Sequence, residues 1–173
     1  MNITRVMLAG AIVALLGGCS DDPDLSGLYE VTYHTFSADN CDVEGDAVDT
    51  PLYFRMDKDK FFGVDIFTFS GCDSATDPDC NSPAMLVSSF TQPIDNGWKG
   101  VVSYTSWSGT DCSLGYVEGT AVLEEGGIRI ETRRWADQVQ LPEGACTTDE
   151  AESRGKQMPC DGYEVIVGAT VPE

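Results

Sequence analysis

The clearest structural signal in this chain is carried by residues 114–135, which read LGYVEGTAVLEEGGIRIETRRW. Leu114–Glu124 and Ile128–Trp135 are both rich in β-branched and aromatic residues, and Glu125-Gly126-Gly127 lies between them. Two such runs joined by a short segment containing glycine are typical of a β-hairpin. The stretch therefore predicts two adjacent antiparallel strands.

Similar runs occur on both sides of this hairpin. The run from Gly27 to Phe36 alternates, with Tyr29, Val31 and Tyr33 on one face and polar residues, His34 among them, on the other. The other predicted strands are Leu52–Met56, Lys60–Phe69, Met85–Phe90, Trp98–Trp107 and residues 163–167, with short connections at Asp57-Lys58-Asp59 and Asp95-Asn96-Gly97. We therefore expect a mainly β fold, a single antiparallel up-and-down β-barrel or barrel-like meander of about eight strands.

One helix is expected near the C-terminus, from Thr147 to Gln157. Thr147-x-x-Glu150 matches the capping box that begins many helices, because each of the two side chains can satisfy a free backbone N–H. The segment contains few apolar residues. It is therefore predicted as a short surface helix.

The amino terminus has the pattern of an export signal. Val6–Leu16 is apolar or small without a break, which fits a signal h-region and is too short to span a bilayer. Leu16-Gly17-Gly18-Cys19 follows and resembles the lipobox of bacterial lipoproteins. The resemblance implies cleavage between Gly18 and Cys19 and a lipid on the Cys19 thiol. In that family, a serine directly after the cysteine, here Ser20, favours transport to the outer membrane.

This resemblance divides the chain into a signal peptide (1–18), an acidic linker after the lipidated cysteine (19–25) and a disulfide-stapled β-barrel domain (26–173). It implies a cell-envelope protein, lipid-anchored in the outer membrane of a Gram-negative bacterium and facing the periplasm or the surface. An ordinary secretion signal, with Cys19 left as a free thiol, is the alternative.

The chain has seven cysteines, and a lipid on Cys19 leaves an even number to form disulfides. No two of them form a C-x-x-C pair, so zinc and thioredoxin-type sites lack their spacing. An oxidising compartment favours structural disulfides. In the meander, all the loops that carry these cysteines emerge at one end, opposite the tight turns and the lipid. The sequence leaves the connectivity open, and the favoured pairs are Cys41–Cys112, Cys72–Cys80 and Cys146–Cys160.

The charge of the chain limits its partners. Lys and Arg total 10 against 29 Asp and Glu, which gives a net charge of −19 at pH 7. Such a charge repels nucleic acid and anionic lipid headgroups, so nucleic acid is not an expected partner. The aromatic and hydrophobic content argues against disorder, since disordered chains of high charge lack both. We expect a folded domain outside the cytoplasm.

No catalytic constellation stands out, and the chain is expected not to be an enzyme. His34 is the only histidine and is interpreted as a surface residue. The G-x-S-x-G motif of serine hydrolases does not occur. A carboxylate-dependent hydrolase remains an alternative, because carboxylates are abundant.

Two further groups of residues are candidates for binding. Acidic residues flank three cysteines and are hypothesised to bind calcium, although their spacing is not that of an EF-hand: Asp42, Glu44, Asp73, Asp77 and Asp79. No other cofactor is expected. A second set of aromatic residues would either line an apolar cavity or fill the barrel core: Tyr29, Tyr33, Phe54, Phe62, Phe67, Trp98 and Tyr104.

The predicted architecture resembles the lipocalin-type calycins, which also have a meander barrel, a late helix and a returning strand. Gly27-Leu28-Tyr29 stands where that family has G-x-W, with Tyr in place of Trp, and seven strands rather than eight precede the helix. The resemblance implies no particular ligand. The first hypothesis is a non-enzymatic binding module that presents its acidic loops away from the membrane to a small apolar ligand or a protein partner. The alternative is a structural surface lipoprotein with a filled core and no ligand.

Overall fold

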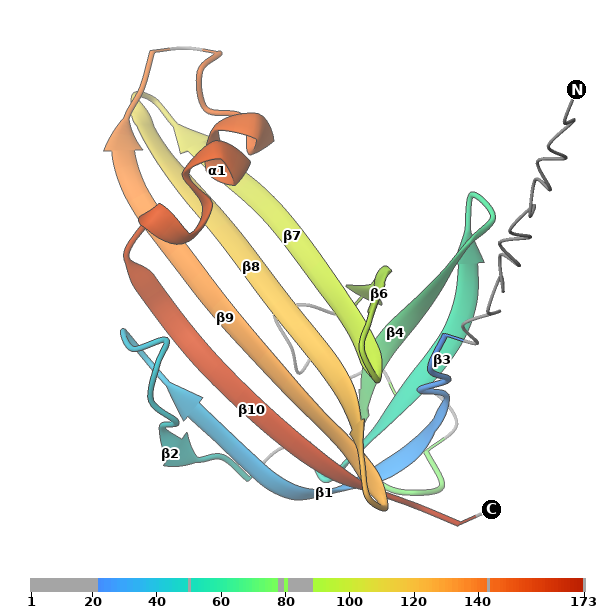
Figure 1. The fold of residues 1–173 in the computed structure, drawn as a ribbon. Coiled ribbons are helices and arrows are strands. Elements are labelled where there is room, and N and C mark those ends of the chain that lie inside the picture. The colour runs from blue at the N-terminus through green and yellow to red at the C-terminus, as the bar shows by residue number, and fades with distance from the viewer. Residues whose placement is uncertain (1–21, 50, 78–79, 81–88, 143, 173) are drawn as a thin grey trace, which may run out of the picture.

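The computed structural model describes residues 22–49, 51–77, 80, 89–142 and 144–172. The predicted signal peptide and Cys19 lie outside these residues. The fold is mainly β, an antiparallel, nearly closed barrel with one short α-helix, as the sequence predicts (Figure 1). Within the described part of the chain, no helix is long and apolar enough to cross a membrane.

The strands follow the expected order, and their bounds are as follows. They are β1 (Gly27–Ser37), β2 (Asp46–Ala47), β3 (Tyr53–Phe61), β4 (Val64–Cys72), β5 (Ser89–Phe90), β6 (Gln92–Ile94), β7 (Gly97–Ser108), β8 (Asp111–Glu124), β9 (Gly127–Gln140) and β10 (Cys160–Thr170). The helix α1 (Thr148–Arg154) and a 3₁₀ turn (Gly155–Gln157) separate β9 from β10. Of the strand predicted at Met85–Phe90, only the last two residues lie within the described chain, as β5.

Two seams close the wall of the barrel. At the first seam β1 pairs with β10 along most of its length, beginning with Tyr29 opposite Thr170. At the second seam β5 pairs with β4, and β6, which follows directly, pairs with β7. The rings of Phe67 in β4 and Trp98 in β7 meet there, with their centroids 5.0 Å apart. The first seam is a continuous ladder, whereas β4 and β7 approach each other only over a short stretch at the second, so the barrel is nearly closed.

Two of the predicted turns are confirmed and one is wrong. Asn96, in the β6–β7 turn, and Gly126, in the β8–β9 turn, both have positive φ, as tight hairpin turns require. The turn expected at Asp57-Lys58-Asp59 lies instead inside β3, whose exposed residues carry alternating charges that resemble a polar loop. The chain reverses at Phe62-Gly63, where φ is 49° and 84°.

Side chains fill the closed part of the barrel. Tyr29, Phe54 and Phe69 stack in sequence, with ring centroids 5.1 and 5.0 Å apart. The full buried cluster consists of Leu25, Tyr29, Phe54, Met56, Phe67, Phe69, Phe90, Trp98, Val117, Ala121, Ile128, Ile130 and Ile166. Four of the seven candidate aromatic residues thus belong to the core.

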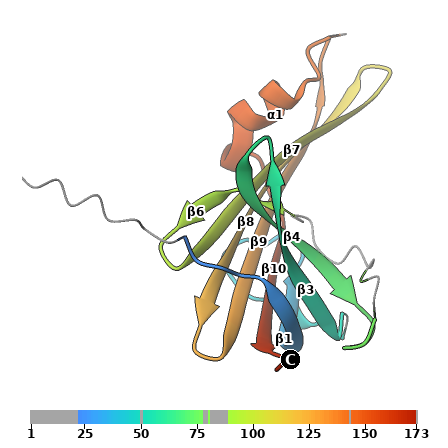
Figure 2. The same cartoon turned by 90° about the vertical axis from the view of Figure 1, so that its right-hand side faces the viewer.

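The helix begins where the capping box predicts. The Thr147 hydroxyl accepts a hydrogen bond from the Glu150 backbone N–H, which satisfies one of the free donors of the first turn. The helix lies beside β7 and β8 at one end of the barrel (Figure 2). Its buried Ala151 belongs to a second apolar cluster that includes Leu114, Trp135 and Met158. A thin apolar stripe is therefore enough to attach it to the outer wall.

Three disulfides are present, and two of the predicted pairings are wrong. Cys72–Cys80 is confirmed. Cys41 pairs with Cys160 rather than with Cys112, because β10 lies next to β1 and its first residue comes close to the loop that follows β1. Cys112 pairs with Cys146, which connects β8 to the segment leading into α1. The predicted Cys146–Cys160 clip around the helix does not form.

The cysteines also do not all gather at one end of the barrel. β3 pairs only with the first four residues of β1, from Gly27 to Glu30. Cys72 lies opposite Tyr53, which lies opposite Glu30, so this bridge is level with the first half of β1. The other two bridges lie near the end of the barrel that carries α1. A meander topology predicts the direction of each strand, but it does not determine over how many residues two adjacent strands pair.

We expect the disulfide map of the purified protein to show Cys41 linked to Cys160 and Cys112 linked to Cys146. The check is proteolysis without reduction, followed by mass spectrometry of the linked peptides. A peptide that links Cys41 to Cys112 would contradict the β1–β10 seam, because closure at that seam brings Cys41 to Cys160.

Candidate functional site

Residues 23–25, just before β1, pack into the end of the barrel at which β1 begins. Leu25 is fully buried and belongs to the core cluster. The Trp98 indole N–H donates to the Pro23 carbonyl oxygen at 2.7 Å, and the Tyr29 hydroxyl donates to the Leu25 carbonyl oxygen at 2.9 Å. Residues 23–25, which are expected to belong to the linker, therefore pack against the core of the domain.

Asp24 holds this segment in place electrostatically. Its carboxylate accepts a hydrogen bond from the Ser26 backbone N–H at 2.9 Å. Hydrogen bonds from Ser26 and the charge of Lys58 lower the pKa of Asp24, against a smaller opposing effect of burial. Burial, and then the charge of Asp24, raise the pKa of Tyr29. Asp24 thus stays ionised next to β3, at the start of the barrel.

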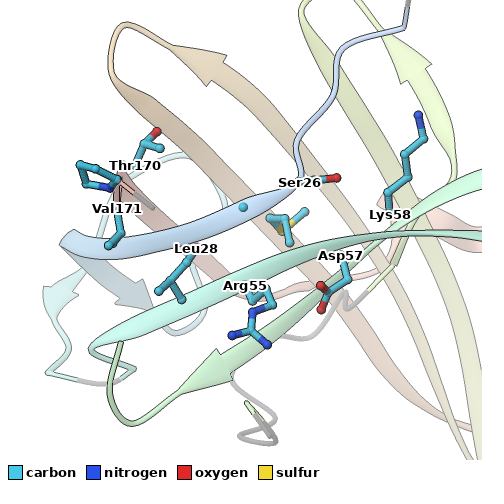
Figure 3. Close-up of a pocket in the computed structure, with 10 residues that line it drawn as sticks. Ser26, Leu28, Arg55, Asp57, Lys58, Thr170 and Val171 are labelled. Carbon is cyan, nitrogen blue, oxygen red and sulfur yellow. The ribbon is translucent and has the colours of Figure 1, made fainter. Parts of the chain in front are cut away.

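A hollow of about 490 Å³ lies beside this segment (Figure 3). Leu28 of β1 and Arg55 of β3 are cross-strand partners and point to the same side of the sheet in the figure, whereas Lys58 points the other way. The lining residues come from the start of β1, from β3 and from the end of β10: Ser26, Gly27, Leu28, Arg55, Met56, Asp57, Lys58, Thr170, Val171 and Pro172. The surface combines apolar groups with the guanidinium of Arg55, the carboxylate of Asp57 and the ammonium group of Lys58.

Arg55 differs from the other basic residues of the described chain in having no carboxylate partner. Arg129, for example, lies 2.7 Å from Glu44 and 2.8 Å from Glu131. The remaining Lys and Arg side chains also form ion pairs. An unpaired guanidinium presents fixed hydrogen-bond donors and suits a carboxylate or phosphate oxygen. The hollow can therefore bind an anionic group, and its lining includes neither histidine nor cysteine.

The opposite end of the barrel carries a second open surface, which we call the trough. Along β7 the inward-facing positions change from buried Trp98 to Val102 and Tyr104, which are 37% and 42% exposed. Tyr104 lies opposite Gly115. A Cβ atom added to Gly115 would come within 2.1 Å of the tyrosine ring, so the ring packs directly against the glycine. A hollow of about 310 Å³ adjoins it, lined by Tyr104, Ser113, Leu114, Ala136, Asp137, Gln138 and Asp161.

His34 is buried, and its interpretation as a surface residue is wrong. A register shift between Val31 and Tyr33 inverts the alternation of β1, so His34 faces inward opposite Ile166. Its Nε2 lies 2.9 Å from Oε1 of Glu164, and both residues are 7% exposed. This buried pair links β1 to β10. A bulge of this kind leaves no clear signal in the sequence.

The other candidate residues are spread over the molecule. Glu44 is occupied by the Tyr33 hydroxyl and by Arg129, whose hydrogen bonds lower the pKa of the Glu44 carboxyl. Asp42 lies in the loop after β1 and Asp73 directly after β4. Asp79 lies outside the described residues. Within the described ranges, no group of three or more side chains is placed to hold a metal ion.

We expect Leu25→Ala to destabilise the domain by about 2–4 kcal/mol, because it empties a fully buried site between core aromatics. Urea denaturation followed by tryptophan fluorescence measures the change. Leu52→Ala is the matched control, since Leu52 is 57% exposed and should cost under about 1 kcal/mol. Equal effects of the two substitutions would show that residues 23–25 do not plug the barrel.

No family model, curated protein or solved structure matches this chain. The similarity of Leu16-Gly17-Gly18-Cys19 to a lipobox and of the strand order to the lipocalins therefore remains a prediction from the sequence.

Proposed function

We propose that the protein is a cell-envelope lipoprotein of the outer membrane, a non-enzymatic binding module held through acylated Cys19. Its filled barrel is a rigid spacer, and its trough binds a partner away from the membrane. The partner is an extended protein segment or a small apolar molecule. A surface lipoprotein that binds nothing is the alternative.

The observation that carries this proposal is the plug formed by Pro23 and Leu25. Cys19 precedes Pro23 by four residues, which span at most about 14 Å when fully extended. A lipid on Cys19 would therefore hold the membrane close to the mouth of the barrel. The disulfides Cys41–Cys160 and Cys112–Cys146 stiffen the end that carries α1 and the trough. The anchor and the binding surface thus occupy opposite ends.

The filled core directs binding to the trough rather than to a central cavity. Bulky aromatic side chains occupy the barrel interior, so an apolar ligand has no room there without repacking. In the trough, Val102 and Tyr104 offer exposed apolar surface to a partner. Among the described strands, none pairs with β7 beyond Lys99 on the side away from β8. Unpaired backbone groups of this kind favour an extended segment that adds a strand.

Acylation of Cys19 is tested by intact mass spectrometry of the protein extracted from membranes of its native host. We expect a mature chain that begins at Cys19 and carries the mass of two or three acyl chains. Cys19→Ser is the control and should accumulate as the uncleaved precursor. A chain that retains its leader in wild-type cells, or a mature chain with a free thiol at Cys19, would rule out the anchor.

Partner binding is tested with a photo-crosslinking amino acid placed at Tyr104 in cells of the native host. We expect a defined adduct from position 104 and none from position 125, in the exposed β8–β9 turn at the other end of the barrel. Val102→Ser in the same cells should reduce the adduct several-fold, because it removes apolar contact area beside the probe. The alternative of a structural lipoprotein predicts no adduct from either position.

A further inference from the structure

The tip of the β3–β4 hairpin carries an unusual group of exposed apolar side chains. Phe62 is 92% exposed, Phe61 63% and Val64 56%, and the two phenylalanines are the most exposed large hydrophobic side chains that the structure describes. Their rings meet edge to face, with centroids 4.5 Å apart. Exposed groups of this kind mark contact surfaces more often than isolated exposed residues do.

The backbone makes this arrangement more notable. Phe62 has φ of 49°, a left-handed conformation that Asn, Asp and Gly adopt far more readily than a bulky aromatic residue. In the β7–β8 turn, the first position also has positive φ, and it is filled by Gly109. A phenylalanine at this position therefore costs conformational energy and gains no burial within the chain. This cost is not offset by burial within the described chain, which fits a tip that another surface covers.

The hairpin lies at the end of the barrel where the described chain begins, opposite α1 (Figure 1). Asp24 is close enough to Lys58 of β3 for the lysine charge to lower the pKa of its carboxyl. From Lys58 the strand runs about 13 Å further to Phe62. From Asp24 the chain can run back to Cys19 over at most about 17 Å. A lipid on Cys19 and the hairpin tip can therefore reach the same plane.

We propose that the Phe61–Val64 tip inserts into the same lipid surface that holds acylated Cys19. Phenylalanine side chains on a projecting turn suit the boundary between headgroups and acyl chains. Lys58 and Lys60, both 3.3 Å from Asp65, offset the charge of that carboxylate at the base of the hairpin. The proposal rests on the proposed anchoring, because one acyl attachment and one hairpin together fix the orientation of the barrel. The trough then points away from the membrane.

The test uses the acylated protein in phosphatidylcholine vesicles, a neutral surface chosen because the chain is strongly acidic. Phe62→Trp places a fluorophore at the tip, and bromine-labelled lipids quench tryptophan only when it lies among the acyl chains. Thr110→Trp, in the exposed β7–β8 turn at the other end, is the matched control. We expect at least twofold stronger quenching for Phe62→Trp than for the parent, and the parental value for Thr110→Trp.

Flotation of the same vesicles separates the two proposals. Protein that floats with the vesicles while Phe62→Trp and Thr110→Trp are quenched equally would overturn insertion of the tip and leave the anchor intact. If the protein isolated from membranes of its native host carries no acyl group and does not float, both proposals are overturned. As a second measurement, hydrogen exchange of residues 59–66 should slow several-fold on vesicle binding in the parent and stay unchanged in Phe61→Ser/Phe62→Ser. Unchanged exchange in the parent would argue for a protein partner on the tip instead.

Discussion

The ladder between β1 and β10 is the constraint on which the rest of the structure depends. It joins the two ends of the domain, with Tyr29 opposite Thr170, across almost the whole sequence. Because β10 lies next to β1, Cys160 meets Cys41, and the inward-facing His34 meets Glu164 of β10. The same ladder fixes the start of β1, from which Leu25 enters the core. A separation of 119 residues also makes the Cys41–Cys160 bridge effective, since it restricts a long loop of the unfolded chain.

The filled interior decides where function can lie. A small barrel either encloses a cavity or packs its centre with side chains, and here the stacked rings of Tyr29, Phe54 and Phe69 occupy the centre. Binding is therefore left to the ends and the outer wall. Most basic side chains of the wall already form ion pairs, because carboxylates are abundant in this chain. Arg55 is the exception within the described chain, and it lies near the proposed anchor.

The two ends of the barrel differ in construction, which supports a protein with a fixed orientation. One end has the plug, the hollow beside Arg55 and the apolar hairpin tip. The other has two disulfides, the capped helix α1 and the trough around Tyr104. The trough is open because β3 accompanies only the first part of β1, and nothing in the described chain pairs with β7 beyond Lys99. A partial wall thus leaves a surface that a closed barrel would have covered.

Local features of this protein are determined by the sequence alone. Alternation and turn chemistry place the β8–β9 hairpin, the β6–β7 turn and the helix capped by Thr147, because each depends on residues a few positions apart. Only the tertiary structure determines the burial of Leu25, the inward orientation of His34 and the pairing of the cysteines. Leu25 is buried by aromatic residues from distant strands, His34 is turned inward by a bulge, and Cys41 finds Cys160 across a seam between the chain ends. Such contacts join residues that are far apart in the sequence, so they depend on how the barrel closes, which no local pattern records.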